Sequence, residues 1–180
     1  MNERFPTVGI IGAGQLARMS IAPATALGIN LLLFAQDKED SAAQISQHVV
    51  GDFRDLTQLL EFSKQCDLIT FEHELVPLSV IKGLEAAGVK VFPSSNSFQY
   101  SQDKAAMRAK LATYPSPKWK VIEDEGQAFD FPFMAKKISG GYDGRGVWKV
   151  KNLDDLEELL AEHSQLLIEE LIEFDCEIAV

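Results

Sequence analysis

The sequence predicts an α/β protein in which a parallel sheet is followed by a second domain with antiparallel strands. Through the first hundred residues, short apolar runs alternate with amphipathic segments, which is the pattern of an open parallel sheet covered by helices. After Pro93, two strand-like runs flank a glycine-rich loop, which is typical of an antiparallel hairpin. We expect one domain over residues 1–100 and a second over residues 101–180.

The first domain should contain five strands and three helices. Because its apolar runs are almost uninterrupted, both faces of the sheet should be covered. A capping box from Asp55 to Gln58 predicts the start of one helix, and Pro77 and Gly88 suit the start and end of another. The expected strands are residues 7–11, 30–35, 48–50, 67–71 and 89–92, and the expected helices are residues 15–27, 55–65 and 77–88.

The second domain should mix helices with antiparallel strands. Asn152 is the expected cap of its second helix. The chain finishes on an apolar segment, Ile178 to Val180, which fits either a natural C-terminal strand or a strand that has been cut short. The expected helices are residues 101–114 and 152–163, and the expected strands are residues 118–122, 133–138, 146–150, 166–171 and 176–180.

Composition restricts the class of protein. The chain has 46% hydrophobic residues, no apolar run of membrane-spanning length and no secretory signal, so we expect a cytoplasmic protein without a membrane partner. Its two cysteines, Cys66 and Cys176, form no metal-like motif and should be reduced, buried thiols. A net charge of -10 argues against sequence-independent nucleic-acid binding. An anionic small ligand is still allowed, because salt screens charges beyond about 8 Å.

A first glycine cluster follows the first expected strand. Gly12, Gly14 and Ala17 form GxGxxA at a helix start, where backbone N–H groups can meet a negatively charged ligand. Asp37 follows the second strand at the spacing of nicotinamide-binding proteins, so that interpretation stays open. Glycines that only permit tight strand–helix packing are the alternative. In the first helical turn, Gln15 can hydrogen-bond a ring or a ribose, and Arg18 can pair with an anion or an acidic neighbour.

An acidic loop, TFEHEL, follows the strand expected at residues 67–71. Glu72 and Glu74 should therefore lie at the carboxyl edge of the sheet, where open α/β sheets bind ligands. They could hold hydroxyl or amine groups there. A solvated acidic loop is the alternative.

A second glycine cluster, GGYDGRG, joins the two strands of the expected hairpin. Four glycines exceed what a tight turn needs, which indicates a flap whose N–H groups fold over phosphates. Lys136 and Arg145 supply positive charge, and Tyr142 and Asp143 lie at the tip. A long surface hairpin is the alternative. Further along, acidic residues at strand ends could hold adenosine or simply face solvent: Glu169, Glu170, Asp175 and Glu177.

Five segments in this order resemble one family: IIGAGQLARM, FEHEL, SQDKAAMR, KISGGYDGRG and EELIEFDCEIAV. They are similar to N5-carboxyaminoimidazole ribonucleotide synthetases of the ATP-grasp superfamily. The resemblance implies a Rossmann-like pre-ATP-grasp domain with a parallel sheet, then the first part of an ATP-grasp fold, an α+β subdomain. The chain departs from the family pattern at Ala13, Ala17, His73 and Leu75, and the family is about twice as long, so the resemblance also implies a truncated chain.

The resemblance implies a function as well. The family uses ATP and bicarbonate to carboxylate 5-aminoimidazole ribonucleotide in purine biosynthesis, through carboxyphosphate, and its members are commonly homodimers. It uses Mg²⁺, whose ligands would lie beyond residue 180. These 180 residues alone should therefore not catalyse the reaction.

The resemblance also assigns residues. Gln15 and Leu16, with Glu72 or Glu74, would contact the aminoimidazole ribonucleotide. Lys104 and Lys136 would meet the ATP phosphates, and Tyr142, Asp143 and Arg145 would act near the reacting groups. Glu169, Glu170, Leu171 and Ile172 would hold adenine, and Glu177 the ribose. The flap over the phosphates would consist of Gly141, Tyr142, Asp143, Gly144, Arg145, Gly146 and Val147.

Three other functions remain open at this point. A formate-dependent glycinamide ribonucleotide formyltransferase shares the architecture and the acyl-phosphate chemistry. A nicotinamide oxidoreductase would rest on Gly12, Gly14 and Asp37. A non-catalytic nucleotide-binding fragment is the third.

Overall fold

The structure is a computed structural model that describes residues 4–141, 145–176 and 178. The chain divides into two compact units, Met1–Gln99 and Tyr100–Val180. Each unit has its own sheet, and the two are described separately below.

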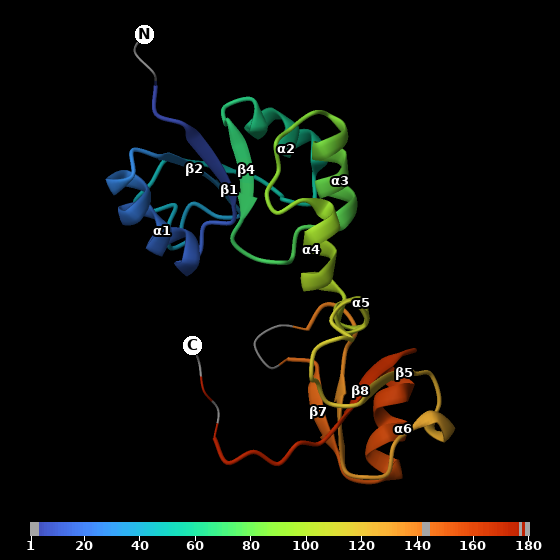
Figure 1. Cartoon of the computed structure of the whole chain (residues 1–180). Coiled ribbons are helices and arrows are strands. Elements are labelled where there is room, and N and C mark those ends of the chain that lie inside the picture. The colour runs from blue at the N-terminus through green and yellow to red at the C-terminus, as the bar shows by residue number, and fades with distance from the viewer. Residues whose placement is uncertain (1–3, 142–144, 177, 179–180) are drawn as a thin grey trace. The chain divides into compact units, whose positions relative to one another are not determined.

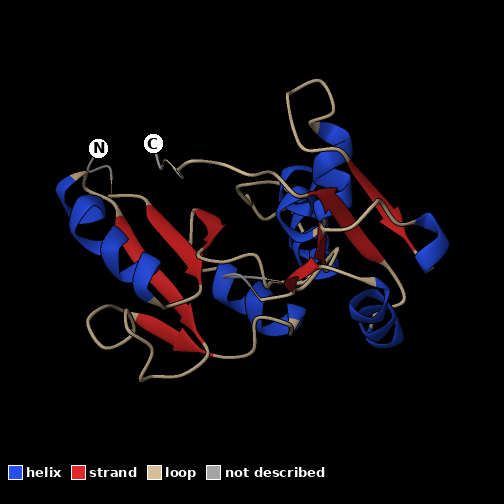
Figure 2. Ribbon diagram, turned by 90° about the horizontal axis from the view of Figure 1, so that it is seen from below, coloured by secondary structure: helices blue, strands red, loops and turns tan. Residues whose placement is uncertain are grey.

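The first unit contains the expected parallel sheet. Its strands have the order β3-β2-β1-β4, and all of the pairs are parallel. Figure 2 shows strands side by side in this unit. Val8 lies opposite Leu31 on one side and Leu68 on the other. The prediction of a parallel sheet is confirmed. The strands are β1 (Thr7–Ile11), β2 (Asn30–Ala35), β3 (His48–Val50) and β4 (Leu68–Phe71).

The strand expected at residues 89–92 is wrong. Only an isolated bridge forms there, between Ile69 and Val91. The Ile69 N–H donates to the Lys90 carbonyl at 2.8 Å, and the Phe92 N–H donates to the Ile69 carbonyl at 2.9 Å. The pairing goes no further, and Pro93, a residue that disfavours the continuation of a strand, follows at once.

Helices cover both faces of this sheet, as predicted. Figure 1 shows α1 (Gln15–Ala26) on one side of the strands, and α2 (Leu56–Ser63) and α3 (Leu78–Ala86) on the other. Neighbouring residues of one strand therefore enter different cores: Ile10 packs with Ala17, whereas Ile11 packs with Phe62 and Leu84. This alternation follows from the two-residue period of a strand.

The predicted capping box is present at the start of α2. Asp55 Oδ1 accepts hydrogen bonds from the N–H groups of Thr57 and Gln58, at 2.8 and 3.3 Å. The Gln58 side chain donates back to Asp55 Oδ2 at 2.9 Å. Pro77 precedes α3, and Gly88, with a φ of +82°, follows its end, as the sequence indicated.

The helix expected at residues 101–114 is wrong as a single element. Two shorter helices stand in its place, α4 (Ser95–Gln102), which the sequence analysis missed, and α5 (Lys104–Lys110). Asp103 separates them in an extended conformation, with φ -124° and ψ 104°, and its carboxylate accepts a hydrogen bond from the Ala106 N–H at 2.8 Å. An N-cap residue of this kind ends the preceding helix as it begins the next.

The second unit is built around an antiparallel sheet in the order β5-β8-β6-β7. The predicted hairpin between β6 and β7 is confirmed, with Lys136 opposite Val147. Asn152 caps α6 (Leu153–Glu162), as predicted, by accepting from the Asp155 N–H at 3.0 Å. A 3-10 turn, η1 (Glu125–Gln127), follows β5. The strands are β5 (Trp119–Ile122), β6 (Phe133–Lys136), β7 (Val147–Val150) and β8 (Leu166–Glu170).

The core of the second unit lies on the face of the sheet that α6 covers (Figure 1). Alternate strand residues supply it, among them Phe133, Ala135 and Ile168, together with Leu156 from α6. In the segment expected as a strand at residues 176–180, Cys176 and Ile178 belong to no strand. Glu177, Ala179 and Val180 lie outside the described residues.

The cysteines differ in exposure. Cys66 is partly buried, but Cys176 is exposed, so the prediction of two buried thiols is wrong for Cys176. In the part of the chain that the structure describes, no helix has the length and apolar character needed to cross a membrane.

Candidate functional site

The Gly12 loop encloses the carboxylate of Glu72. The Glu72 side chain follows β4 and lies at the N-terminus of α1, where it accepts three backbone hydrogen bonds. The Gly14 N–H donates to Oε2 at 2.6 Å, and the Leu16 and Ala17 N–H groups donate to Oε1 at 3.0 and 3.2 Å. A carboxylate is well placed there, because the N–H groups of the first turn carry a partial positive charge.

The glycines of this loop make room for Glu72. Gly12 has a φ of +118°, and a Cβ at this position would lie 2.6 Å from both Cβ and Oε2 of Glu72. A Cβ on Gly14 would lie 2.7 Å from Glu72 Oε1. Glycine is therefore needed at both positions to leave space for the Glu72 carboxylate. The helix N-terminus that would hold a pyrophosphate in a dinucleotide-binding protein is already occupied by the chain's own carboxylate.

Asp37, the other feature of a nicotinamide site, has a local structural role. Its Oδ1 accepts a hydrogen bond from the Glu39 N–H at 2.9 Å within the turn after β2. Arg18, for which we expected an anion or an acidic neighbour, donates to the Ser41 carbonyl at 3.0 Å. Both side chains therefore have partners within the first unit.

The residues expected to contact a substrate in the first unit come together only in part. Gln15 and Leu16 are exposed in the first turn of α1, and the Glu72 carboxylate is bonded to the backbone of the same turn. Glu74 lies two residues further along the loop and is partly buried. The Glu72 carboxylate therefore lies beside the turn that carries Gln15 and Leu16.

In the second unit, three charged side chains meet on the sheet face opposite the α6 core. Glu169 of β8 accepts from Lys136 of β6 at Oε2, at 2.6 Å, and from Arg108 of α5 at Oε1, also at 2.6 Å. The Glu169 side chain is only 5% exposed, and those of Arg108 and Lys136 are 21% and 23% exposed. One buried carboxylate between two cations leaves this three-residue cluster with a net positive charge.

The glycine-rich loop begins where Lys136 ends β6. The Lys104 N–H donates to the Ile138 carbonyl at 2.9 Å, and the Lys104 ammonium donates to the Gly141 carbonyl at 3.2 Å. Gly146 has a φ of +74°, and its carbonyl accepts from the Lys137 N–H at 2.9 Å. The start of α5 is thus attached to the base of the loop, so Lys104 and Arg108 approach the loop and the sheet from one helix.

The other residues of this unit that were predicted to bind a ligand do not join the Lys136–Glu169–Arg108 cluster in the part of the chain that the structure describes. Glu170 is tied to the start of β5, because its carboxylate accepts from the Lys118 N–H at 3.0 Å. Leu171 is partly buried and Ile172 is exposed just after β8. Arg145 is exposed and Val147 begins β7. Tyr142, Asp143, Gly144 and Glu177 lie outside the described residues.

Arg108 is the residue that sequence reasoning missed. It lies within SQDKAAMR, four positions after Lys104 and therefore on the same face of a helix. That spacing was the available signal. What the sequence did not contain was the placement of α5 against β8, which turns this face toward Glu169.

No metal site is evident among residues 4–141, 145–176 and 178, where no three His, Cys, Asp or Glu side chains gather as potential ligands. Two of the acidic side chains, Glu72 and Glu169, are bonded within the chain. The described residues therefore form no cluster that could hold a metal ion by itself.

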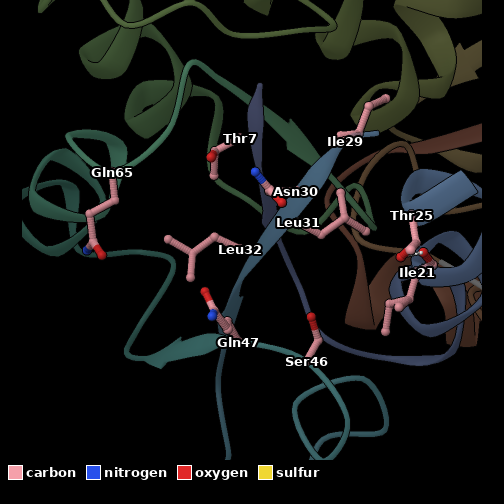
Figure 3. A pocket seen from close by; sticks show the side chains of 10 residues that line it. All are labelled: Thr7, Ile21, Thr25, Ile29, Asn30, Leu31, Leu32, Ser46, Gln47 and Gln65. Atoms are coloured by element: carbon pink, nitrogen blue, oxygen red, sulfur yellow. Dashed lines mark hydrogen bonds between the residues drawn. The ribbon is translucent and has the colours of Figure 1, made fainter. Parts of the chain in front are cut away.

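A hollow of about 460 Å³ lies elsewhere on the first unit, at the amino ends of β1 and β2 (Figure 3). Figure 3 shows Ile21 and Thr25 on one side of β2, and Gln47 and Gln65 on the other. None of the residues predicted from the sequence to bind a ligand lines it. It lies at the sheet edge opposite the Gly12 loop, so it is separate from the candidate site.

Comparison with protein families identifies both units. Residues 5–102 match the model of the ribonucleotide synthetase preATP-grasp domain, and residues 104–180 match that of the ATP-grasp domain. The chain belongs to the ribonucleotide synthetase preATP-grasp family. The Gly12 loop and Glu72 are therefore features of a preATP-grasp domain, and the Lys136–Glu169–Arg108 cluster lies within the ATP-grasp match.

Individual relatives of this family extend the match across both units. The chain is 36% identical to the N5-carboxyaminoimidazole ribonucleotide synthase of Mycobacterium tuberculosis (strain H37Rv), over 97% of this chain and 44% of the relative. It is 34% identical to the synthase of Synechococcus elongatus, over 96% of this chain and 47% of the relative. The chain thus spans a little under half the length of these curated relatives.

Solved structures agree. The N5-carboxyaminoimidazole ribonucleotide synthetase of Thermotoga maritima matches 95% of this chain and 47% of its own, with a TM-score of 0.80 and 28% identity. The carboxyaminoimidazole ribonucleotide synthase of Aspergillus clavatus complexed with ATP matches 96% of this chain and 48% of its own, with a TM-score of 0.81 and 29% identity. Together with the two sheets, these matches confirm the predicted fold class and the predicted family resemblance.

Proposed function

We propose that this chain is part of an enzyme that uses ATP and bicarbonate to carboxylate 5-aminoimidazole ribonucleotide, giving N5-carboxyaminoimidazole ribonucleotide for purine biosynthesis. One observation carries the proposal: the similarity to N5-carboxyaminoimidazole ribonucleotide synthases is continuous over 97% of the chain at 36% identity. It spans the Glu72 loop and the Lys136 cluster alike. A similarity of one unit alone would support only a shared domain.

In this proposal the ATP phosphates bind the positively charged sheet face of the second unit. Lys136 and Lys104 would each contact a phosphate as a point charge. The loop from Gly141 to Val147 would cover the phosphates with its N–H groups. The segment from Glu169 to Ile172 would hold adenine, and Glu177 would accept the ribose hydroxyls. A solved relative from Aspergillus clavatus complexed with ATP supports a nucleotide in the family.

The aminoimidazole ribonucleotide would bind at the carboxyl edge of the parallel sheet, at Gln15, Leu16 and the Glu72–Glu74 loop. Because three N–H groups fix the Glu72 carboxylate, it would present a rigid acceptor to a hydroxyl or an amine. A second solved structure from Aspergillus clavatus contains ADP and 5-aminoimidazole ribonucleotide. That complex supports the same substrate class here.

The proposed chemistry has two steps. Bicarbonate oxygen attacks the γ-phosphate of ATP, which gives ADP and carboxyphosphate. The exocyclic amine of the ribonucleotide then captures the activated carbon, phosphate leaves, and the amine loses a proton. Because carboxyphosphate hydrolyses easily, a flap that excludes water would protect it. We assign the flap residues Tyr142, Asp143 and Arg145 to the reacting groups.

Mg²⁺, which the family requires, would neutralise phosphate charge during transfer. We propose, from the resemblance to the family, that its ligands come from outside these 180 residues; no three potential ligands gather among the described residues. A protein consisting of these 180 residues alone is therefore expected to show no bicarbonate-dependent ATP turnover. We further propose a cytoplasmic location and a homodimer, with neither nucleic acid nor membrane as a partner.

Phosphate release by the complete protein that carries this sequence tests the proposal. Release should require both bicarbonate and aminoimidazole ribonucleotide, and it should be absent with formate and glycinamide ribonucleotide. Activity only with the second pair would identify a formyltransferase instead. Binding of NADH would favour an oxidoreductase, although the groups on which that alternative rests are already bonded within the fold.

The role of the flap tip has its own test in the complete enzyme. Asp143→Asn should lower turnover more than ATP affinity, because the carboxylate is proposed to orient the amine or accept its proton. Steady-state kinetics with an independent ATP-binding measurement separate the two effects. A loss of ATP affinity alone would make Asp143 a clamp on the nucleotide.

A further inference from the structure

The carboxylate of Glu169 is buried and is bonded to two cations. Each of its oxygens has a different partner: Oε1 is 2.6 Å from Arg108, and Oε2 is 2.6 Å from the Lys136 ammonium. Burying a carboxylate is costly unless its lone pairs are satisfied by strong, charge-assisted hydrogen bonds. Here the two cations satisfy it from two separate elements, α5 and β6.

The register of the sheet explains how these groups meet. Glu169 lies opposite Met134 on β6, and Lys136 lies opposite Leu167 on β8. The two charged residues are therefore diagonal neighbours on one face, a separation that long side chains bridge. Arg108 reaches the same carboxylate from α5, whose start is fixed by the bond from the Lys104 N–H to the Ile138 carbonyl.

The two cations compete for the charge of one carboxylate. If Lys136 were the sole partner of Glu169, its positive charge would be neutralised within the protein. Because Arg108 is bonded to the other oxygen, the cluster retains one unit of positive charge, and the Lys136 ammonium is held in place without being fully neutralised. This arrangement suits a lysine that must attract an anion from solvent.

We infer that Arg108 and Glu169 are positioning residues for nucleotide binding: Glu169 holds the Lys136 ammonium on the phosphate-binding face, and Arg108 offsets Glu169 so that Lys136 stays available to phosphate. This inference rests on the proposed function, because it takes Lys136 as a phosphate ligand. It adds to that function a residue, Arg108, and a role for the Glu169 side chain distinct from contact with adenine.

Paired binding measurements on the complete protein test this inference. Arg108→Met should weaken ATP binding by about tenfold, the effect of one charge-assisted contact, because Glu169 then neutralises Lys136. Binding of adenosine, which has no phosphate, should be unchanged. Adding Glu169→Gln to Arg108→Met should recover part of the ATP affinity, since Lys136 is then no longer neutralised, although it has lost the carboxylate that holds it in place. Arg108→Lys should retain near-normal affinity.

A matched control is Lys110→Met, which removes the same charge from an exposed position on α5 and should leave ATP binding unchanged. The inference is overturned if Arg108→Met weakens ATP and adenosine equally, which would mark a purely structural role. It is also overturned if the double variant binds ATP no better than Arg108→Met. Absence of ATP binding by the unaltered protein would instead overturn the proposed function.

Discussion

Glu72 shows how one side chain determines what its neighbours must be. Its carboxylate fills the space in front of α1, and the conformation of Gly12, with φ at +118°, brings the backbone against it. An L-residue is disfavoured at that φ, and any Cβ would collide with Glu72. The need for glycine at this position therefore follows from packing within the chain.

Gly12→Ala is accordingly expected to destabilise the first unit by more than about 3 kcal/mol, since backbone strain and a clash at 2.6 Å act together. Gly88→Ala is the matched control. Gly88 also has a positive φ, of +82°, but a Cβ there meets nothing within 4 Å, so only about 1 kcal/mol of strain is expected. Chemical denaturation of both variants checks this. Equal losses of stability would show that the Glu72 contact is unimportant.

Cys66 is a second residue whose surroundings set its chemistry. Burial, with a smaller contribution from the Asp67 carboxylate, raises the pKa of its thiol to about 11. At pH 8 only about 0.1% of such a thiol is the reactive thiolate. Iodoacetamide at pH 8 should therefore label the exposed Cys176 first, and a Cys176→Ser variant should react slowly until it is unfolded. Fast labelling of that folded variant would contradict the expected pKa.

At the scale of elements, α5 depends on the residue that begins it. Asp103 accepts the Ala106 N–H at 2.8 Å, and α5 carries both Lys104 and Arg108. Asp103→Ala should cost about 1 kcal/mol and speed hydrogen exchange at Ala106. Asp103→Asn, which keeps a capping oxygen, is the control and should cost much less. If both variants exchanged like the unaltered chain, the cap would have no role in holding α5.

Caps and strand periods were the parts of the fold that the sequence could predict. Asp55 and Asn152 predicted two helix starts correctly, because a cap is a local interaction. The failures were also local in origin. Asp103 broke an otherwise continuous helical pattern, and Pro93 ended a strand pattern after one bridge. In both cases the spacing of apolar residues predicted a longer element than the backbone preference of one residue, Asp103 or Pro93, allows.

The site was predictable only where the sequence spacing itself brings residues together. Lys136 and Glu169 were each expected on a strand, but their ion pair depends on the pairing and register of β6 against β8, which the sequence did not predict. The partnership of Glu72 with the first turn of α1 joins residues more than fifty positions apart. Such contacts are set by packing, which a single sequence does not contain.

Across the first unit as a whole, stability should fall in acid. Hydrogen bonds from the Ser95 hydroxyl and N–H, at 2.6 and 2.7 Å, lower the pKa of Glu85 below its ordinary 4.5. A bond from the Thr7 N–H lowers the pKa of Asp67 below its ordinary 3.8, with a further contribution from Arg4. A carboxylate with a lowered folded-state pKa stabilises above its unfolded value, and that contribution is lost as the pH falls through the folded value.

Thermal unfolding between pH 7 and pH 3 checks this expectation. The midpoint should decline below about pH 4.5, and Glu85→Gln should lower the midpoint at pH 7 while flattening its decline in acid. Glu39→Gln, at an exposed position, is the control and should follow the unaltered chain. An unchanged acid decline in Glu85→Gln would show that the Ser95 bonds contribute nothing.

The strand order of the second sheet has a consequence for how the chain is made. Within the described residues, β5 pairs with β8 alone, whereas β6 and β7 pair locally as a hairpin. A ribosome that had released residues only as far as Gln165 would therefore have made a complete hairpin but left β5 with its backbone groups unpaired. The four-stranded sheet is complete only once Leu166–Glu170 has been released. Because Glu169 belongs to this strand, the sheet and its charged cluster are completed together.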